Sequence, residues 1–388
     1  ICFFNTAIPW GGGEKWHLET ATFMHEKGHK VVVVCNKGSA LHHKLEKTTI
    51  PTFTIKIGNL SFLNPIKLLR LIQFYKNYNV KIVILNLSRD VKAGGLAAFI
   101  SKVNRKIYFK GSANAVRNSR TNRLIYTHII DEILVNSLAT KNCIYQNNKA
   151  IFNKDYVKII PHGVNFELIE KRKFKPIYKK KENELVLLSL GRLETEKNHS
   201  FLIDVAIQLK KDGVRFKLLI GGSGSLYEHL KRRVETNQLD DDVYFVGFVK
   251  NPKDFYKSGD VLLLPSLYEG FGFVIIEAAA NKIPVVAFDN SSKPEIVKQN
   301  VTGILTPDND VAEFSSAVKK LYFDRKLTAK IGENAYSFTK DLFSIDEINS
   351  KIEKYLTQGF DKRISAIVTT YNEEKNIENC LNSITWAD

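Results

Sequence analysis

The sequence predicts an α/β protein in which two doubly wound, Rossmann-like parallel-sheet domains face each other. Short apolar runs rich in β-branched residues alternate with amphipathic stretches of helical length, which is the pattern of strand–helix–strand units. The alternation breaks at a basic, irregular stretch near 171–181 and then restarts, so we expect one domain on each side of that linker. At 388 residues the chain is long enough for two such domains.

The first domain is expected over 1–165 and the second over 166–340, followed by a helix over 341–357 that crosses back to the first domain. A helix beginning near 344 fits the capping-box-like pair Ser344 and Glu347. Strands are expected at 1–5, 30–35, 52–56, 81–85, 106–109, 132–135, 157–160, 185–190, 215–221, 243–246, 260–264 and 284–288, with helices at 14–27, 66–78, 137–147 and 198–212 among others.

The positive charge is concentrated in the first half of the chain. The formal net charge is +16, and residues 1–160 hold 24 lysines and arginines against 8 acidic residues, so they account for all of the excess. Such asymmetry indicates an anionic partner, which is a phospholipid surface, a phosphorylated lipid or nucleic acid. The alternative is a lysine-rich but merely solvated surface. No apolar run reaches the length of a membrane span.

The cysteines and the start of the chain indicate the cellular compartment and whether the chain is part of a longer protein. Cys2, Cys35, Cys143 and Cys380 have no metal-ligand spacing, and no signal peptide opens the chain, so we expect a reducing cytoplasm. The chain begins inside an apolar run, and its single methionine, Met24, lies within a helical pattern. We therefore expect a fragment of a longer protein.

The most informative segment is a strand-to-helix turn at 265–278. An apolar strand precedes it, and the turn contains Glu269, Gly270, Phe271 and Gly272 before a helix that includes Glu277. The glycines let a ligand approach the backbone, and the free N–H groups of the helix start suit a phosphate. The two carboxylates can then address one ligand from different sides. The alternative is an ordinary helix start with a solvated Glu277.

Two further strand-helix loops carry residues of the same kind. Arg192 and Lys197 follow the strand 185–190, and their two cations match a diphosphate, although surface charges on a loop are the plainer interpretation. In the first domain, the glycine-rich turn at 11–14 precedes a helix and indicates phosphate or sugar approach.

Together these motifs resemble the retaining GT-B glycosyltransferases of family 4, over residues 1 to about 357. The resemblance implies that Arg192 and Lys197 hold the donor diphosphate and stabilise the departing nucleoside diphosphate, and that Glu269 contacts the donor sugar. It implies that Glu277 binds the ribose hydroxyls. The remaining donor contacts that it implies are Gly11, Gly12, Gly222, Phe248, Val249, Gly270, Phe271 and Gly272.

The sequence departs from this family pattern on the acceptor side. Lys110 stands where many relatives carry His or Arg, and with Glu14 it is the expected acceptor-side contact. His162 replaces the usual Asn before the hinge glycine, and we expect a structural histidine there. The tail over 364–388 resembles the truncated start of a family 2, GT-A glycosyltransferase, without the metal-binding Asp-x-Asp of that family.

Two weaker signals have plainer explanations. The glycine-rich run at 220–225 does not fit a dinucleotide fingerprint, because Tyr227 stands at its last glycine position. The acidic run 240–242 precedes a strand and is expected to be a solvated turn. No metal or other cofactor is expected, since Arg192 and Lys197 can neutralise the diphosphate.

The sequence thus predicts a retaining glycosyltransferase that moves a sugar from a nucleoside-diphosphate sugar to a saccharide or lipid-linked acceptor in cell-surface glycan synthesis. Its basic first domain is expected to meet an anionic membrane surface on the cytoplasmic side, with no nucleic acid as partner. The alternatives are a GT-B sugar-nucleotide epimerase and a non-catalytic basic module that binds anionic lipid or RNA.

Overall fold

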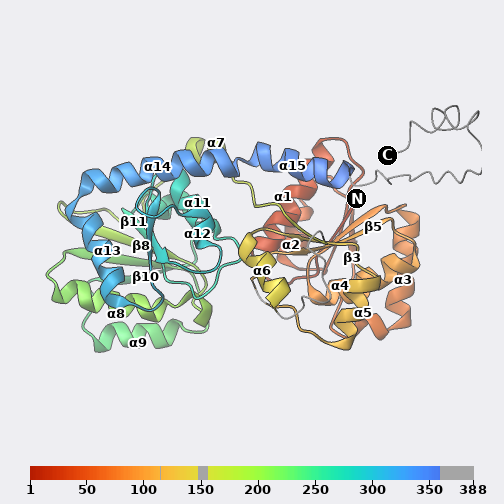
Figure 1. The fold of residues 1–388 in the computed structure, drawn as a ribbon, viewed down its shortest axis with the longest axis horizontal. Coiled ribbons are helices and arrows are strands. Elements are labelled where there is room, and N and C mark those ends of the chain that lie inside the picture. The colour runs from red at the N-terminus through yellow and green to blue at the C-terminus, as the bar shows by residue number, and fades with distance from the viewer. Residues whose placement is uncertain (114, 147–155, 359–388) are drawn as a thin grey trace, which may run out of the picture. The chain divides into compact units, whose positions relative to one another are not determined.

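The computed structural model describes residues 1–113, 115–146 and 156–358, which form two parallel-sheet lobes and a C-terminal helix. Residues 1–349 make one compact unit, and it contains both lobes. Helices pack on both faces of each sheet (Figure 1). Within the described residues, no helix is both long enough and apolar enough to cross a bilayer. The predicted family 2 start at 364–388 lies outside the described residues.

The N-terminal lobe is a seven-stranded parallel sheet in the order β3-β2-β1-β4-β5-β6-β7. Its central strands are buried on both faces, which is why they appear in the sequence as continuous apolar runs. The strands are β1 (Cys2–Phe4), β2 (Val32–Cys35), β3 (Thr52–Thr54), β4 (Ile82–Leu85), β5 (Arg105–Lys110), β6 (Glu132–Val135) and β7 (Val157–Ile159). The helices are α1 (Gly12–Glu26), α2 (Ala40–Leu45), the 3₁₀ helix η1 (Ser61–Leu63), α3 (Pro65–Asn77), α4 (Ser88–Ile100), α5 (Arg120–His128) and α6 (Leu138–Gln146).

The C-terminal lobe is a six-stranded parallel sheet in the order β10-β9-β8-β11-β12-β13. The strands are β8 (Leu185–Leu190), β9 (Phe216–Gly221), β10 (Val243–Gly247), β11 (Val261–Leu264), β12 (Val285–Phe288) and β13 (Gly303–Thr306). The helices are α7 (Phe166–Lys171), the 3₁₀ helix η3 (Thr195–Lys197), α8 (His199–Lys211), α9 (Tyr227–Thr236), α10 (Pro252–Tyr256), α11 (Phe273–Ala280), α12 (Lys293–Ile296), α13 (Val311–Phe323), α14 (Arg325–Phe343) and α15 (Ile345–Gln358).

Both sheets reverse their strand order at one point, and loops beyond such a point form a ligand crevice. In the N-terminal lobe the reversal separates the loops after β1 and β4, because β1 pairs with both β2 and β4. In the C-terminal lobe it separates the loops after β8 and β11. The turns at 11–14, 191–198 and 265–272 therefore all lie at these reversal points.

Two chain segments run side by side where the lobes connect. The Val164 N–H donates to Phe343 O at 2.8 Å, and the Ile345 N–H donates to Val164 O at 3.1 Å. Gly163 packs so tightly here that an added methyl carbon would lie 2.8 Å from the Ile345 Cα. The linker and the end of α14 thus meet in one two-stranded connection. The return of the terminal helix to the first domain stays a prediction.

Candidate active site

The loops after β8 and β11 bring Lys197 and Glu269 together. The Lys197 Nζ donates to Glu269 Oε1 at 2.6 Å, and the two side chains are only 19% and 10% exposed. Arg192 lies on the same loop as Lys197, but its guanidinium is 71% exposed and pairs with Glu196. A buried ion pair and a solvent-facing guanidinium therefore stand at the edge of the C-terminal sheet.

Close packing between two glycine-rich loops shapes this edge. Gly222 has a φ of +134°, and a methyl carbon placed on it would lie 1.8 Å from Gly191 O. Only glycine fits this position without displacing the loop that carries Arg192. Val249 packs beneath the same loop against Gly221, whereas Phe248 is exposed. Gly222 thus supports the Arg192 loop directly.

Two helix N-termini, one from each lobe, meet at this site. Gly11 precedes α1, Gly272 precedes α11 with a φ of +87°, and neither residue offers a side chain to cap its helix. A methyl carbon on Gly12 would lie 3.2 Å from the ring of Phe273, the first residue of α11. Helix N-termini carry partial positive charge and free N–H groups. Their convergence therefore favours an anionic ligand.

Glu277 lies about one turn into α11, apart from the Lys197–Glu269 pair in its contacts. Its carboxylate accepts from the Lys15 Nζ at 3.5 Å and from the Tyr256 hydroxyl at 3.3 Å. The Lys15 ammonium also lies 4.9 Å from the Phe273 ring centre. Lys15 belongs to α1 of the N-terminal lobe, so it joins the two lobes beside the meeting point of their helices.

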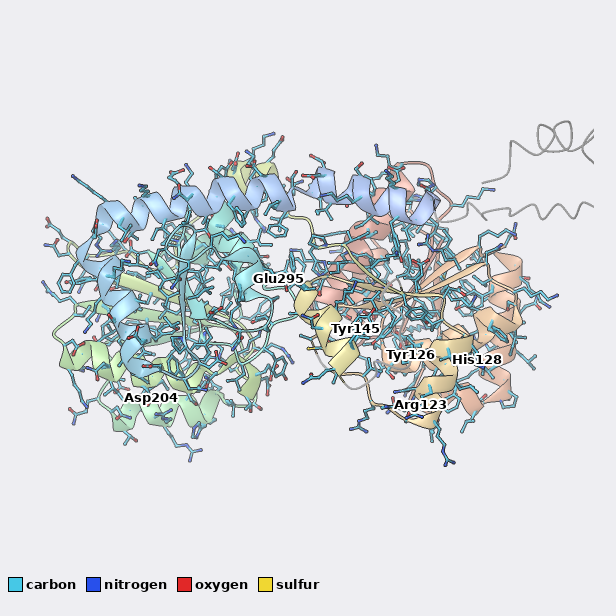
Figure 2. The ribbon with its side chains drawn as sticks, viewed as in Figure 1. Arg123, Tyr126, His128, Tyr145, Asp204 and Glu295 are labelled. Atoms are coloured by element: carbon cyan, nitrogen blue, oxygen red, sulfur yellow. The ribbon has the colours of Figure 1, made fainter. Side chains whose placement is uncertain are left out.

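A second set of contacts ties the Glu269–Gly272 turn to the N-terminal lobe. The Ser137 hydroxyl donates to Gly270 O at 2.6 Å, and the Thr140 hydroxyl donates to the same oxygen at 3.2 Å. Glu295 accepts the N–H groups of Leu138 and Ala139, each at 2.8 Å, at the start of α6 (Figure 2). A carboxylate at a helix N-terminus is favourably placed. We call these contacts the α6 clasp.

The expected acceptor-side residues lie at the carboxyl ends of the N-terminal strands. Glu14 is buried, and its Oε1 accepts from Asn5 Nδ2 and Asn86 Nδ2, each at 3.2 Å. Lys110 ends β5, and its Nζ lies 3.4 Å from Ser112 Oγ. Burial lowers the pKa of Lys110 to about 8, because the charged ammonium loses hydration.

His162 occupies an aromatic cluster between the lobes. Its ring centre lies 4.9 Å from that of Phe271 and 4.4 Å from that of Phe273. Burial, with Lys15 nearby, lowers its pKa to about 3, so the imidazole is neutral. The Nε2 accepts from Asn136 Nδ2 at 3.1 Å. The Nδ1 of the same ring is buried without a hydrogen-bond partner, so the structural role expected from the sequence stays a prediction.

One residue of the acidic run at 240–242 forms ion pairs with lysines. Asp242 pairs with Lys210 at 3.0 Å and with Lys217 at 3.3 Å, at the amino edge of the sheet. Asp240 and Asp241 are exposed residues of a turn, as the sequence predicted.

Sequence reasoning missed several residues that complete the site. Lys15, Tyr256 and Glu295 each contact an element that is distant in the sequence, so no local pattern reports them. The Asn5 and Asn86 side chains had a weak signal, because each follows a buried strand at the reversal point. Ser137 directly precedes α6, where a polar residue that caps a helix is common.

Comparison with known proteins gives the class of this fold. HepE of Anabaena, solved in complex with UDP and glucose, superimposes with a TM-score of 0.77 at 22% identity, over 92% of this chain and 99% of that one. Such a likeness shows the fold, which is GT-B. The two parallel-sheet lobes predicted from the sequence are confirmed.

A family model covers most of the C-terminal lobe. Residues 170–338 match the family described as Glycosyl transferases group 1. A glycosyltransferase of Methanocaldococcus jannaschii is 31% identical over 210 residues, 51% of this chain and 54% of that protein. Among the curated relatives it matches, several are covered by this chain over only about half their length, 44% to 54%.

One relative aligns over most of both chains. The Escherichia coli UDP-Gal:alpha-D-GlcNAc-diphosphoundecaprenol alpha-1,3-galactosyltransferase is 24% identical over 339 residues, which is 81% of this chain and 86% of that protein.

Proposed function

We propose that this protein is a retaining glycosyltransferase that moves a sugar from a nucleoside-diphosphate sugar to a saccharide or lipid-linked acceptor in bacterial cell-surface glycan synthesis. The observation that carries the proposal is the meeting of the α1 and α11 N-termini beside Lys15 and the Lys197–Glu269 pair. This arrangement concentrates positive potential where a diphosphate would lie, with carboxylates beside it for hydroxyl groups.

The proposed reaction needs charge stabilisation more than proton transfer. When the bond between the sugar and the diphosphate breaks, negative charge develops on the departing phosphate oxygens. Lys197, Arg192 and the backbone N–H groups at Gly12 and Gly272 are preorganised donors for that charge. Because Lys197 is already fixed by Glu269, it needs little reorganisation when the bond breaks.

The two carboxylates and the neighbouring loops are proposed to bind the sugar, the ribose and the base of the donor. Glu269 is proposed to accept from sugar hydroxyls, and Glu277 from the ribose hydroxyls, exchanging the Lys15 and Tyr256 contacts for the ligand. Phe248 and Val249 are proposed to line the base pocket. Lys110 and Glu14 are proposed to meet the acceptor from the N-terminal lobe.

The names of two relatives support a lipid-linked acceptor. The Escherichia coli relative acts, by its name, on a diphosphoundecaprenol-linked sugar. A Campylobacter jejuni relative, 29% identical over 222 residues, is likewise named for a diphospho-undecaprenol substrate. Both substrates present a sugar on an anionic lipid, which agrees with the basic first half of this chain.

Donor binding is the first test. The protein is melted with UDP-, GDP- and ADP-sugars in turn, since a ligand that binds only the folded state raises the melting temperature. We expect one nucleotide class to raise it in a saturable manner. No shift with any UDP-, GDP- or ADP-sugar would remove the basis of the transferase proposal.

Variants then test the residues. With the identified donor, Lys197→Ala and Glu269→Ala are expected to lower kcat for transfer or donor hydrolysis by roughly 10² to 10³, the usual loss for one preorganised charge contact. Lys282→Ala and Glu333→Ala are matched controls, because they break an exposed ion pair of 2.8 Å on the same lobe. Equal effects in both pairs would contradict the assigned roles.

The stereochemical outcome needs its own measurement. If the transfer is retaining, NMR of the first product formed shows the anomeric configuration of the donor sugar. An inverted product would leave transfer intact and overturn retention.

A further inference from the structure

The middle of the N-terminal lobe has an unusual charge distribution. Between Glu46 and Asp131 the sequence contains fifteen lysines and arginines and a single acidic residue, Asp90. Asp90 is buried, where its carboxylate accepts from Thr6 and from the Leu87 N–H at 3.1 Å. The described surface built from this segment therefore carries cations without an exposed carboxylate.

Four large aliphatic side chains project from the same segment. Leu60, Leu63, Ile66 and Leu69 are 72%, 66%, 68% and 64% exposed. Leu60 precedes η1 and Leu63 ends it. Ile66 and Leu69 lie on the first two turns of α3, whose other face buries Leu71, Phe74 and Tyr75. We call these four residues the η1–α3 face. Exposed apolar side chains that gather in this way mark an interaction surface.

Cations border the η1–α3 face closely. Arg70 is exposed, one residue after Leu69 and four after Ile66, which puts it on the same side of α3. The Lys67 Nζ lies 3.2 Å from Ser61 Oγ, and the Lys92 ammonium lies 5.9 Å from the Phe62 ring centre. On α5, which contacts α4, Arg123 projects away from the sheet (Figure 2). Arg70, Lys67 and Lys92 thus lie beside the aliphatic side chains of this face.

The fold places this region near the proposed acceptor side. In a parallel sheet each helix begins at the carboxyl edge of the strand before it. The start of α3, the start of α5 and the turn at 11–14 therefore share one edge of the N-terminal sheet with the end of β5, where Lys110 lies. A partner that covered the η1–α3 face would adjoin that edge.

We propose that the η1–α3 face docks on a bilayer that contains anionic phospholipid. Its aliphatic side chains enter the headgroup boundary, and Arg70, Lys67 and Lys92 contact the lipid phosphates. A second copy of this chain is disfavoured as the occupant, because two surfaces of like charge would meet. RNA is disfavoured too, since single-stranded RNA stacks on aromatic side chains and these four are aliphatic. The inference concerns a surface apart from the donor residues and goes beyond the proposed function.

Vesicle flotation tests this proposal. The full chain is mixed with phosphatidylcholine vesicles that contain roughly 30% phosphatidylglycerol, and with pure phosphatidylcholine vesicles. We expect binding to the anionic vesicles only. The triple variant Leu63→Ser, Ile66→Ser, Leu69→Ser should bind about tenfold or more weakly. Arg70→Gln with Lys92→Gln should weaken binding about fivefold for each cation removed.

Matched controls distinguish binding through the η1–α3 face from nonspecific apolar adsorption and from misfolding. Val301→Ser, Phe323→Ser, Leu342→Ser removes three exposed apolar side chains from the other lobe and should bind vesicles like the parent chain. Far-UV circular dichroism and the melting temperature report whether each variant folds. Donor-dependent stabilisation should persist in the Leu63, Ile66, Leu69 variant, so a failure here differs from a failure of the transferase proposal. Unchanged flotation of that folded variant, or binding to single-stranded RNA but not to vesicles, would overturn the inference.

Discussion

At the scale of single residues, burial changes the charge of groups near the site. Lys110 and His162 both lie inside the protein, and desolvation shifts each toward its neutral form. The two groups change charge in different pH ranges: Lys110 loses its proton near pH 8, and His162 gains one only in acid.

Lys110 gives the first prediction. If its ammonium binds the acceptor, the KM for the acceptor should rise as the pH passes about 8, where Lys110 loses its proton. Lys110→Arg should keep its charge and suppress this rise, because arginine stays protonated. Initial rates from pH 7 to pH 9.5 measure it. A pH profile identical in the two proteins would show that Lys110 does not carry the effect.

The buried histidines give the second prediction. Burial lowers the pKa of His17 to about 4 and that of His162 to about 3, against an ordinary 6.5. Below pH 6.5 the unfolded chain therefore binds protons that the folded chain does not. The free energy of unfolding should fall with decreasing pH by about 1.4 kcal/mol per unit for each such histidine, with no contribution above pH 6.5.

Urea unfolding at several pH values between 7.5 and 4.5 measures this slope. His162→Gln should reduce it, whereas His43→Gln, a change at an exposed position, should not. If His162→Gln retains the slope of the parent chain, His162 is not a source of the acid sensitivity.

At the scale of elements, the α6 clasp links the Glu269–Gly272 turn and Glu295 to the N-terminal lobe. Glu295→Ala removes two charge-assisted hydrogen bonds to the start of α6, each worth about 1.5–3 kcal/mol when intact. On the proposed function, we expect kcat/KM to fall about tenfold or more while donor affinity stays within about twofold. With donor bound, small-angle scattering should give a larger radius of gyration for the variant than for the parent chain, because the lobes separate more readily.

A conservative change provides the control for the clasp. Glu295→Gln keeps one acceptor oxygen and should recover part of the loss, whereas a purely steric defect would persist. Glu333→Ala removes an exposed carboxylate from the same lobe and should leave the scattering unchanged.

The sequence predicted those elements whose burial gives a continuous apolar run. Strands such as Leu185–Leu190 and Val261–Leu264 were found within a residue or so, because both of their faces are covered. β13 was missed because it begins with Gly303, a residue that is uncommon in strands. The loop residues of the candidate site could be named from glycine spacing. The contacts of Lys15 and Glu295 could not, because they depend on how one lobe meets the other.

At the scale of the whole molecule, the lobes join at the two-stranded connection of Val164 with Phe343 and Ile345. Gly163→Ala would place a methyl carbon 2.8 Å from the Ile345 Cα, so the backbones must separate. We expect a loss of about 1–3 kcal/mol in the free energy of unfolding, as for other overpacked sites. Thermal and urea unfolding measure it. Gly58→Ala, where the nearest atom is 3.9 Å away, should change stability by less than about 0.5 kcal/mol.

The meeting of the α1 and α11 N-termini has a consequence for turnover. The N-terminus of α1 belongs to one lobe and that of α11 to the other. If the lobes separated, a diphosphate bound to one lobe would meet only one helix N-terminus. On the proposed function, the nucleoside diphosphate product is bound by the same two helix N-termini that stabilised its developing charge. Its escape then waits for the lobes to separate, and added nucleoside diphosphate should slow the enzyme more than its affinity for either lobe alone would suggest.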